Sequence, residues 1–352
     1  MTCLNCKNLN LKKIVSMGKQ PLSGIFLNKK TYNLKKYPLD LHICKKCNLV
    51  QLKKYAKLEL MYGSQYGYKT SISKLMIKHL KKKIPRLNRY YKIKKSTRIL
   101  DIGSNDGSFL NLFKNTKNLF GIDPSCAKHK KNYKKYIHTI SNFFSILNIK
   151  KYFKLKKINK LKFDLITSFA IFYDVKNPNK FCNEIYKLLS DNGIWMCEFS
   201  YLPLMLKNLT FDQICHEHLA YYNLSVFKKI IENNNLKVID VSVNEINGGS
   251  IEVLCGKNNC KHNINKSKIN KLLSDEKKIT STSYKNFSKR IKQSKDNLTG
   301  FIKNNKSKRF IGYGASTKGN VVLNHFKISN KSLPYICAVS YTHLTLPTIC
   351  SV

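Results

Sequence analysis

Arginine is scarce in this 352-residue sequence, which has five arginines among 65 basic residues, so that 65 less 5, or 60, are lysines. Long apolar runs are also missing. No N-terminal stretch joins a basic lead to an apolar run of signal-peptide length, and no segment approaches the roughly 18 consecutive apolar residues of a membrane span. These absences predict a soluble, cytoplasmic protein with no membrane partner. The length predicts two or three packed units.

The lysine excess gives a formal net charge of +46. Such a charge suggests nucleic acid, because basic side chains neutralise phosphates. Arginine, however, is the preferred side chain for paired contacts to phosphate and guanine. The lysines are scattered along the chain among Asn, Ile, Tyr and Phe, as an A/T-rich coding bias would produce. Nucleic acid is therefore an unlikely partner on this evidence, although a zinc-knuckle RNA-binding module remains an alternative.

Two cysteine pairs with metal-knuckle spacing occur among the twelve cysteines: Cys3-x-x-Cys6 and Cys44-x-x-Cys47. Each pair can hold one side of a tetrahedral ion, and four thiolates leave no open position for water. We therefore expect a structural Zn²⁺ site rather than four unligated cysteines. The other cysteines lie in apolar surroundings and are expected to be buried hydrophobes, as at Cys182, Cys197 and Cys255.

Short apolar runs alternate with amphipathic stretches from Arg98 onward. This alternation predicts βαβ units and a parallel sheet, with strands at residues 98–102, 119–123, 163–169 and 193–199. Two later runs, 237–243 and 250–255, flank Asn247-Gly248-Gly249 and predict an antiparallel hairpin at the sheet edge. Before the first strand, helical spacing at Ile72, Leu75, Met76, His79 and Leu80 predicts a linker helix that Pro85 interrupts.

The C-terminal part begins with a lysine-rich stretch, 261–305, whose apolar spacing predicts a helical connector. Residues 310–319 then follow the order strand, glycine turn and helix start, which opens a second α/β unit. The turn from Gly312 to Gly319 either cradles a phosphate at a helix start or is simply a tight connection. The last stretch abandons the lysine and asparagine bias and resembles a sequence that is not native to the protein.

The segment Asp101-Ile102-Gly103-Ser104-Asn105-Asp106-Gly107 follows an apolar run. Its glycines let the backbone turn tightly and approach a cofactor at a helix start. Asp123, at the end of the next strand, can bind both ribose hydroxyls of a nucleotide. The spacing Asp-x-Gly-x-x-x-Gly differs from the dinucleotide fingerprint and favours S-adenosylmethionine (SAM) over NAD. Further contacts are expected from Asn142 and Phe143 to the adenine and from Ser168 to the methionine end.

Titratable groups gather between Phe211 and Tyr222, where the core pattern pauses, and proton chemistry is expected there. His216-Glu217-His218 is not a zincin motif, because the two histidines are not four residues apart. A surface turn whose histidines only form hydrogen bonds is the alternative. The aromatic residues of Tyr66-Gly67-Tyr68 either belong to the core or cover a sugar site with a hydroxyl pointing inward.

Several of these motifs occur together, in the order found in one family: both cysteine pairs, Gln20-Pro21-Leu22-Ser23, Tyr66-Gly67-Tyr68, 101–107, 215–222, 247–250 and 312–315. The chain thus resembles the zinc-containing, class I SAM-dependent sugar C-methyltransferases that act on nucleotide-linked 4-keto deoxyhexoses in deoxysugar biosynthesis. The resemblance implies an α/β fold with a Rossmann-like methyltransferase sheet, a small N-terminal zinc-knuckle domain and a truncated C-terminal α/β domain. The expected boundaries are 1–62 for zinc binding, 63–257 for SAM binding, 258–338 for the C-terminal domain and 339–352 for the non-native tail.

The resemblance also implies a mechanism in which a base removes the proton beside the sugar ketone, and the enolate attacks the donor methyl group. By carry-over, His218 is the base, Glu217 orients or charges it, and Tyr66 or Tyr68 lies near the enolate oxygen, with His216 as a second candidate. Some members have a tyrosine at the position of Cys215 and a histidine at that of Asp174. Methyl transfer to oxygen or nitrogen of another small molecule on the same scaffold is the alternative enzyme activity.

Overall fold

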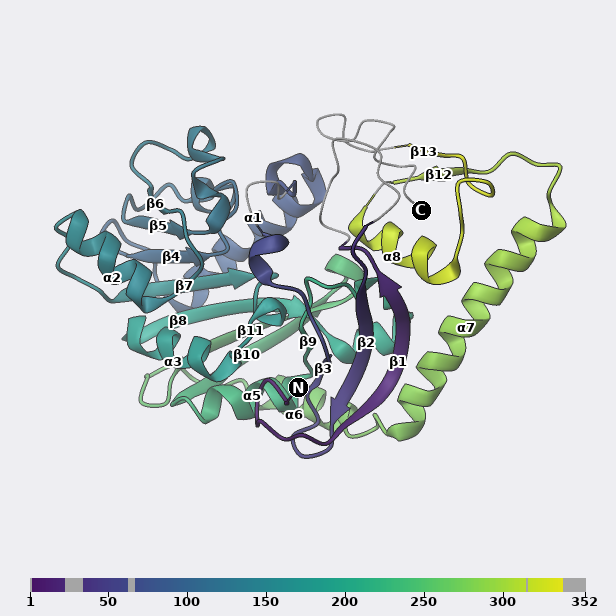
Figure 1. Ribbon diagram of the computed structural model, residues 1–352. Coiled ribbons are helices and arrows are strands. Elements are labelled where there is room, and N and C mark those ends of the chain that lie inside the picture. Colours follow the sequence, from purple (N-terminus) through teal and green to yellow (C-terminus); the bar gives the residue numbers. More distant parts are fainter. Residues whose placement is uncertain (1, 23–33, 63–66, 315, 338–352) are drawn as a thin grey trace.

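The computed structural model describes residues 2–22, 34–62, 67–314 and 316–337. Within these residues the strands form sheets of four, seven and two strands (Figure 1). The predicted non-native tail, 339–352, and the candidate residue Tyr66 lie outside the described residues. Among the helices that are described, none is both long and apolar enough to cross a membrane.

The seven-stranded sheet has the order β10-β11-β8-β7-β4-β5-β6. Neighbours from β8 to β6 are parallel, whereas β11 is antiparallel to both β8 and β10. The sheet therefore confirms the predicted parallel core and the edge hairpin. Its strands are β4 (Ile99–Ile102), β5 (Leu119–Ile122), β6 (His138–Ile140), β7 (Phe163–Phe169), β8 (Leu189–Ser200), β10 (Leu236–Asn244) and β11 (Ser250–Lys257).

The central strands are apolar on both faces because each face packs against helices, as parallel sheets require. Ile99 and Leu165 share a core cluster with Leu80 of α1 (Lys74–Tyr90), on one face of the sheet. Leu100 and Ile166 belong to a second cluster, which packs against α2 (Ile146–Leu155), α3 (Pro178–Leu188) and α5 (Leu224–Glu232). This is the doubly wound arrangement expected of a Rossmann-like domain.

Helix α1 runs through Pro85, so the predicted interruption at this proline is wrong. A proline removes one backbone hydrogen bond from a helix interior, but tertiary contacts hold the turn that follows. Leu87 is fully buried, Arg86 donates to Asp240 over 2.8 Å, and the hydroxyl of Tyr90 donates to the same carboxylate over 2.7 Å. These contacts keep the segment beyond Pro85 helical.

Charged side chains, in addition to apolar ones, join α1 to the hairpin side of the sheet. Lys83 is 5% exposed and lies between the carboxylates of Glu198 on β8 and Glu252 on β11. The carboxylate of Glu198 also contacts His79 over 2.7 Å. Buried charges are costly unless they are paired, so this network specifies one position of α1 over the sheet.

The N-terminal segment supplies three strands of the four-stranded sheet, β1 (Leu11–Gln20), β2 (Tyr37–Cys44) and β3 (Val50–Leu52). The fourth strand, β9 (Ala220–Tyr221), comes from the central segment and pairs with β3 in antiparallel register. The amide of Leu52 also donates to the carbonyl of Leu219 over 2.9 Å. The zinc-knuckle region is thus joined by backbone bonds to the segment that carries the predicted base.

The C-terminal part confirms the helical connector and the second α/β unit. It contains α6 (Lys266–Glu276), the long α7 (Ser281–Asn304) and the parallel pair β12 (Ile311–Tyr313) and β13 (Tyr335–Cys337), joined through α8 (Thr317–Phe326). In Figure 1, α7 and α8 flank the ribbon formed by β1 and β2. Gln20 donates to the carbonyl of Val321 over 3.4 Å, so α8 packs on β1.

Candidate active site and zinc knuckle

The turn that follows β4 has an unusual backbone. Gly103, Asn105 and Gly107 have φ values of 74°, 47° and 76°, in the left-handed region that favours glycine. A Cβ atom on Gly103 would lie 2.2 Å from Ile171, and one on Gly107 would lie 2.6 Å from the ring of Tyr133. Both positions therefore favour glycine by conformation, and the ring of Tyr133 also leaves little room for a side chain at Gly107.

Parallel pairing of β4 with β5 brings Asp123 to the same sheet edge as this turn. One oxygen of its carboxylate accepts from the amide of Asn105 over 3.2 Å, and the other accepts from the amide of Ser125 over 2.7 Å. The structure therefore brings together Asp123 and the turn, as binding of a nucleoside at this position requires. The strand order also reverses here, between β4 and β7, and doubly wound sheets bind their ligands at such a reversal.

Asp101 lies within β4 and is 3% exposed. Burial, with a smaller contribution from the charge of Asp123, raises the pKa of Asp101 to about 7, although a 2.6 Å bond donated by Thr167 opposes the shift. The segment before α1 covers the turn from outside. The amide of Thr70 donates to the side chain of Asn105 over 3.1 Å, and that side chain donates to the carbonyl of Tyr68 over 3.2 Å.

The other residues predicted to contact SAM lie partly in a loop and partly inside the sheet. Asn142 and Phe143 follow β6 at the same sheet edge, with Asn142 exposed. Ser168, by contrast, lies inside β7, where its fully buried hydroxyl accepts from the indole N–H of Trp195 over 2.9 Å. The side chain of Ser168 is therefore already engaged in the sheet. Contacts of all three residues with a donor stay predictions.

A second group of polar residues surrounds His218. Its Nδ1 lies 2.9 Å from the carbonyl oxygen of Gln213. Because a carbonyl only accepts, Nδ1 carries the proton and the lone pair is on Nε2. Burial, with Lys318 of α8 adding to it, lowers the pKa of His218 to about 3, and the bond to Gln213 opposes the shift. His218 is thus a neutral imidazole at pH 7, and its ring centre lies 4.1 Å from that of Tyr173, with the two ring planes tilted by 44°.

Two acidic residues adjoin this ring contact in the sequence, since Asp174 follows Tyr173 and Glu217 precedes His218. Burial raises the pKa of Asp174 well above its usual value, and the charge of Glu217 raises it further. The hydroxyl of Tyr62 donates to Asp174 over 2.7 Å. Glu217 is 8% exposed, and burial together with the charge of Glu217 raises the pKa of the Cys215 thiol. Tyr62 was not among the predicted site residues, because nothing in the local pattern connects it to a residue more than a hundred positions away.

The two histidines of the motif face different neighbours. His216 is 1% exposed, and its Nε2 donates to the carbonyl of Tyr37 over 3.2 Å, at the start of β2. Its ring meets that of Tyr37 edge-on. His216 therefore anchors the segment to the N-terminal sheet, whereas His218 lies beside Tyr173.

The turn at residues 103–107, where SAM is predicted to bind, is called the donor turn below. A short loop after β7 connects it to the residues around His218. Ile171 packs against Gly103, and Tyr173 and Asp174 follow within three residues, in the helical turn Phe172–Asp174. The amide of Leu219 donates to the carbonyl of Tyr173 over 2.9 Å, which fixes the His218 segment against this loop. The positions of the donor turn and the candidate base are thus set by one stretch of chain.

The four predicted metal ligands converge. The sulfur atoms of Cys3, Cys6, Cys44 and Cys47 all lie within 4.8 Å of one another, with 3.5 Å between Cys3 and Cys47 and between Cys6 and Cys44. Zinc–sulfur bonds of about 2.3 Å in a tetrahedron place the sulfurs about 3.8 Å apart. The four sulfur ligands therefore fit Zn²⁺. Cys3 and Cys44 are fully buried and pack in the same core cluster as Leu219.

Sequence models of three families match consecutive parts of the chain. They are described as "Putative zinc binding domain" for residues 3–62, "Methyltransferase domain" for residues 74–241 and "C-methyltransferase C-terminal domain" for residues 245–345. The chain belongs to the zinc-containing C-methyltransferase family. Its central sheet is the SAM-binding domain of a methyltransferase. The third match ends at residue 345, inside the tail predicted to be non-native.

Individual relatives of this zinc-containing methyltransferase are distant. The C-methyltransferase NovU of Streptomyces niveus is 25% identical over 331 residues, which cover 91% of this chain and 77% of NovU. An S-adenosylmethionine-dependent methyltransferase from Clostridium acetobutylicum matches with a TM-score of 0.39 and 13% identity, over 51% of this chain and 92% of its own. The N-methyltransferase NodS of Bradyrhizobium japonicum matches with a TM-score of 0.36 and 15% identity, over 51% and 95%.

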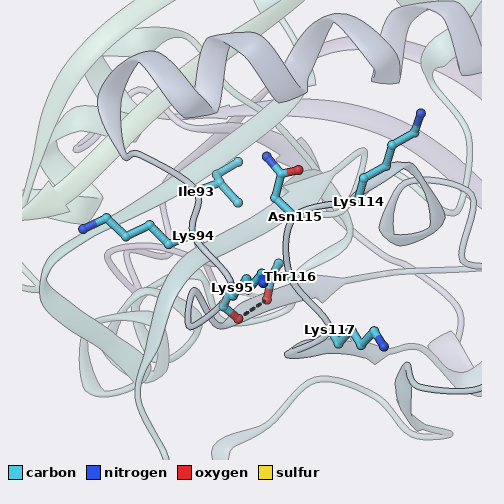
Figure 2. Close-up of a pocket in the computed structure, with 7 residues that line it drawn as sticks. All are labelled: Ile93, Lys94, Lys95, Lys114, Asn115, Thr116 and Lys117. Atoms are coloured by element: carbon cyan, nitrogen blue, oxygen red, sulfur yellow. Dashed lines mark hydrogen bonds between the residues drawn. The ribbon is translucent and has the colours of Figure 1, made fainter.

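The pocket drawn in Figure 2 lies at the opposite edge of the methyltransferase sheet. Its lining residues, 93–95 and 114–117, precede β4 and β5, whereas the donor turn and Asp123 follow these strands. The hydroxyl of Thr116 donates to the carbonyl of Lys95 over 3.2 Å. The side chains of Lys94, Lys114 and Lys117 point in different directions in Figure 2, so their ammonium groups do not converge on one anion.

Proposed function

We propose that this methyltransferase transfers a methyl group from SAM to a carbon beside the ketone of a nucleotide-linked 4-keto deoxyhexose. The observation that carries the proposal is the short loop that joins the donor turn at Gly103 to the neutral imidazole of His218 through Tyr173. C-methylation needs a base at such a position, because a carbon nucleophile must first lose a proton. The relative named C-methyltransferase NovU and the C-methyltransferase match at residues 245–345 support transfer to carbon.

In the proposed reaction, Nε2 of His218 accepts the proton from the carbon next to the sugar ketone. The electrons of that C–H bond form an enolate, and Tyr66 or Tyr68 is the proposed partner of its oxygen. The enolate carbon then takes the methyl group, and the electrons of the broken methyl–sulfur bond stay on the sulfur, which leaves as a neutral thioether. We assign Glu217 to orient or charge His218, because an adjacent negative charge favours a protonated histidine. SAM, when bound by Asp123 and the 103–107 turn, supplies the methyl group on a cationic sulfur.

The zinc ion would be held by the four knuckle cysteines and has a structural role in this proposal, since four thiolates leave no position for substrate. We place the protein in the cytoplasm, where thiols stay reduced. All the described cysteines, eleven in number, are free of disulfides, which agrees with that environment. The same proposal assigns residues 1–62, 63–257 and 258–338 to the zinc, donor and C-terminal domains.

The donor site is tested by calorimetric titration of the zinc-loaded protein with SAM. Asp123→Ala removes the carboxylate that would bind two ribose hydroxyls, and the Kd is expected to rise about 10- to 100-fold, as for loss of charge-assisted hydrogen bonds. Asp275→Ala is the matched control, because Asp275 lies on α6 with its side chain 52% exposed. Equal affinity of wild type and Asp123→Ala would show that the donor binds elsewhere.

The base is tested without the donor, by incubating nucleotide-linked 4-keto deoxyhexoses with the protein in D₂O. Proton abstraction by His218 would incorporate deuterium beside the ketone, and His218→Asn is expected to slow this exchange about 10²- to 10⁴-fold. His216→Asn is the paired variant, since His216 faces the N-terminal sheet. With labelled SAM added, the NMR shift of the product methyl group separates transfer to carbon from transfer to oxygen or nitrogen.

A further inference from the structure

Tyr133 is a buried tyrosine on the chain between β5 and β6, and it contacts the donor turn from behind. It is 6% exposed, and its hydroxyl donates to the carbonyl of Asn105 over 2.8 Å. The hydroxyl of Ser104 lies 2.8 Å from the same phenolic oxygen. Because the single proton of the phenol goes to Asn105, Ser104 is the donor in the second bond.

Asn105 needs such support because its backbone is left-handed, with φ at 47°. That conformation is unfavourable for a residue with a Cβ atom. Three sets of bonds oppose the tendency to relax: Asp123 accepts from its amide, Tyr68 and Thr70 bond its side chain, and Tyr133 bonds its carbonyl. The bond from Tyr133 is the one that holds the carbonyl side of the peptide.

The ring of Tyr133 supports the same turn by contact. Three of its carbons lie within 2.6 to 2.9 Å of the place where a Cβ atom on Gly107 would stand. The backbone on both sides of Tyr133 is also fixed, because the side chain of Asn111 donates to the carbonyl of Asn132 over 2.7 Å and accepts from the amide of Lys134 over 3.1 Å. Tyr133 is therefore a rigid support under the turn.

We propose that Tyr133 is a positioning residue for the methyl donor: its hydroxyl holds the 103–107 turn in the binding conformation before SAM arrives. The inference rests on the proposed donor site. Without the hydroxyl, the turn leaves the left-handed conformation more often, and binding must restore it, which lowers affinity by the cost of that ordering. Once the donor is bound, the turn and the reacting groups are the same as in the wild type.

The test is Tyr133→Phe, which deletes one oxygen and keeps the ring against Gly107. The Kd for SAM is expected to rise about 5- to 30-fold, the range for loss of one or two hydrogen bonds. Hydrogen exchange at the amides of residues 104–107 is expected to quicken in the donor-free protein. The methylation rate at saturating SAM is expected to remain as in wild type.

Tyr136→Phe is the matched control, because Tyr136 lies three residues further on and its hydroxyl bonds to none of the described residues. Ser104→Ala combined with Tyr133→Phe should weaken SAM binding by less than the two single effects multiplied, since both act on one network. Unchanged SAM affinity in Tyr133→Phe, with or without a lower melting temperature, would overturn the proposal and leave Tyr133 a stabilising residue. If wild-type protein fails to bind SAM, the proposed donor site fails first, and the inference falls with it.

Discussion

The neutral imidazole of His218 leads to a prediction about stability and pH that needs no substrate. The pKa of His218 is about 3 in the folded protein because of burial and the charge of Lys318, whereas it is about 6.5 in an unfolded chain. Below pH 6.5 the unfolded chain binds a proton at this residue that the folded protein does not. The free energy of unfolding therefore falls as the pH decreases from 6.5 toward 3.

The size of the effect follows from the two pKa values. At pH 5, about 1.5 units below the unfolded value, one such histidine costs about 2 kcal/mol of stability, and partial exposure of the ring reduces this to about 1–2 kcal/mol. In His218→Asn, the amide nitrogen of the new side chain takes the place of Nδ1 and keeps the bond to the carbonyl of Gln213. Between pH 7 and pH 5, the free energy of unfolding of the variant should thus decrease by about 1–2 kcal/mol less than that of wild type.

The assay is urea unfolding of both proteins at pH 7 and pH 5, with His262→Asn as the control. His262 bonds the carbonyl of Asn192 at the surface, so its variant should follow wild type. Long-range ¹H–¹⁵N NMR, assigned with the His218→Asn variant, should show the Nδ1–H form of His218 down to pH 5. Parallel pH dependence in wild type and His218→Asn, or an imidazolium signal from His218 at pH 6, would refute the reasoning.

Two further predictions concern the zinc knuckle and Asp101. Cys44→Ser should lower the zinc content and the melting temperature. It should also quicken hydrogen exchange at residues 219–221, because β9 is paired with β3 of the zinc-binding region. The control is Cys337→Ser at an exposed site, and unchanged protection of residues 219–221 in zinc-depleted protein would contradict the coupling. Burial raises the pKa of Asp101 to about 7 in the folded protein, above its value of about 3.9 in an unfolded chain. The folded protein therefore binds this proton more tightly, and the resulting stability is fully present below pH 4 and is lost as the pH rises toward 7. Between pH 5 and pH 7, the free energy of unfolding of Asp101→Asn should therefore fall by about 2 kcal/mol less than that of wild type. Asp296→Asn is the control and should follow wild type. Equal decreases in all three proteins would be evidence for an ionised Asp101.

Much of this architecture could be predicted because it depends on local patterns. Alternating apolar runs predicted the strands at 163–169 and 250–255, since a strand buried on both faces must be apolar along its length. The spacing of Gly103 and Gly107 predicted a turn that only glycine can form without strain. The two Cys-x-x-Cys pairs predicted a cluster because each pair presents two sulfurs to one ion, and the four sulfurs do converge.

Other features depend on contacts between segments that are distant in the sequence, and no local pattern contains them. Helix α1 continues through Pro85 because Asp240 binds the turn beyond it, so packing outweighed the preference of the proline. The two histidines likewise face different neighbours because β9, which follows them, completes the N-terminal sheet. His216 faces Tyr37, and His218 faces Tyr173.

The amino-acid sequence by itself determined the types of element, the spacing of the zinc ligands within each pair and the glycines of the donor turn, because each depends on neighbouring residues and their backbone preferences. Only the tertiary structure decided that Asp174 meets Tyr62, that burial and the charge of Lys318 lower the pKa of His218, and that Tyr133 supports Asn105. Burial and electrostatic fields are sums over all the segments that surround a group, so they exist only once the chain is folded.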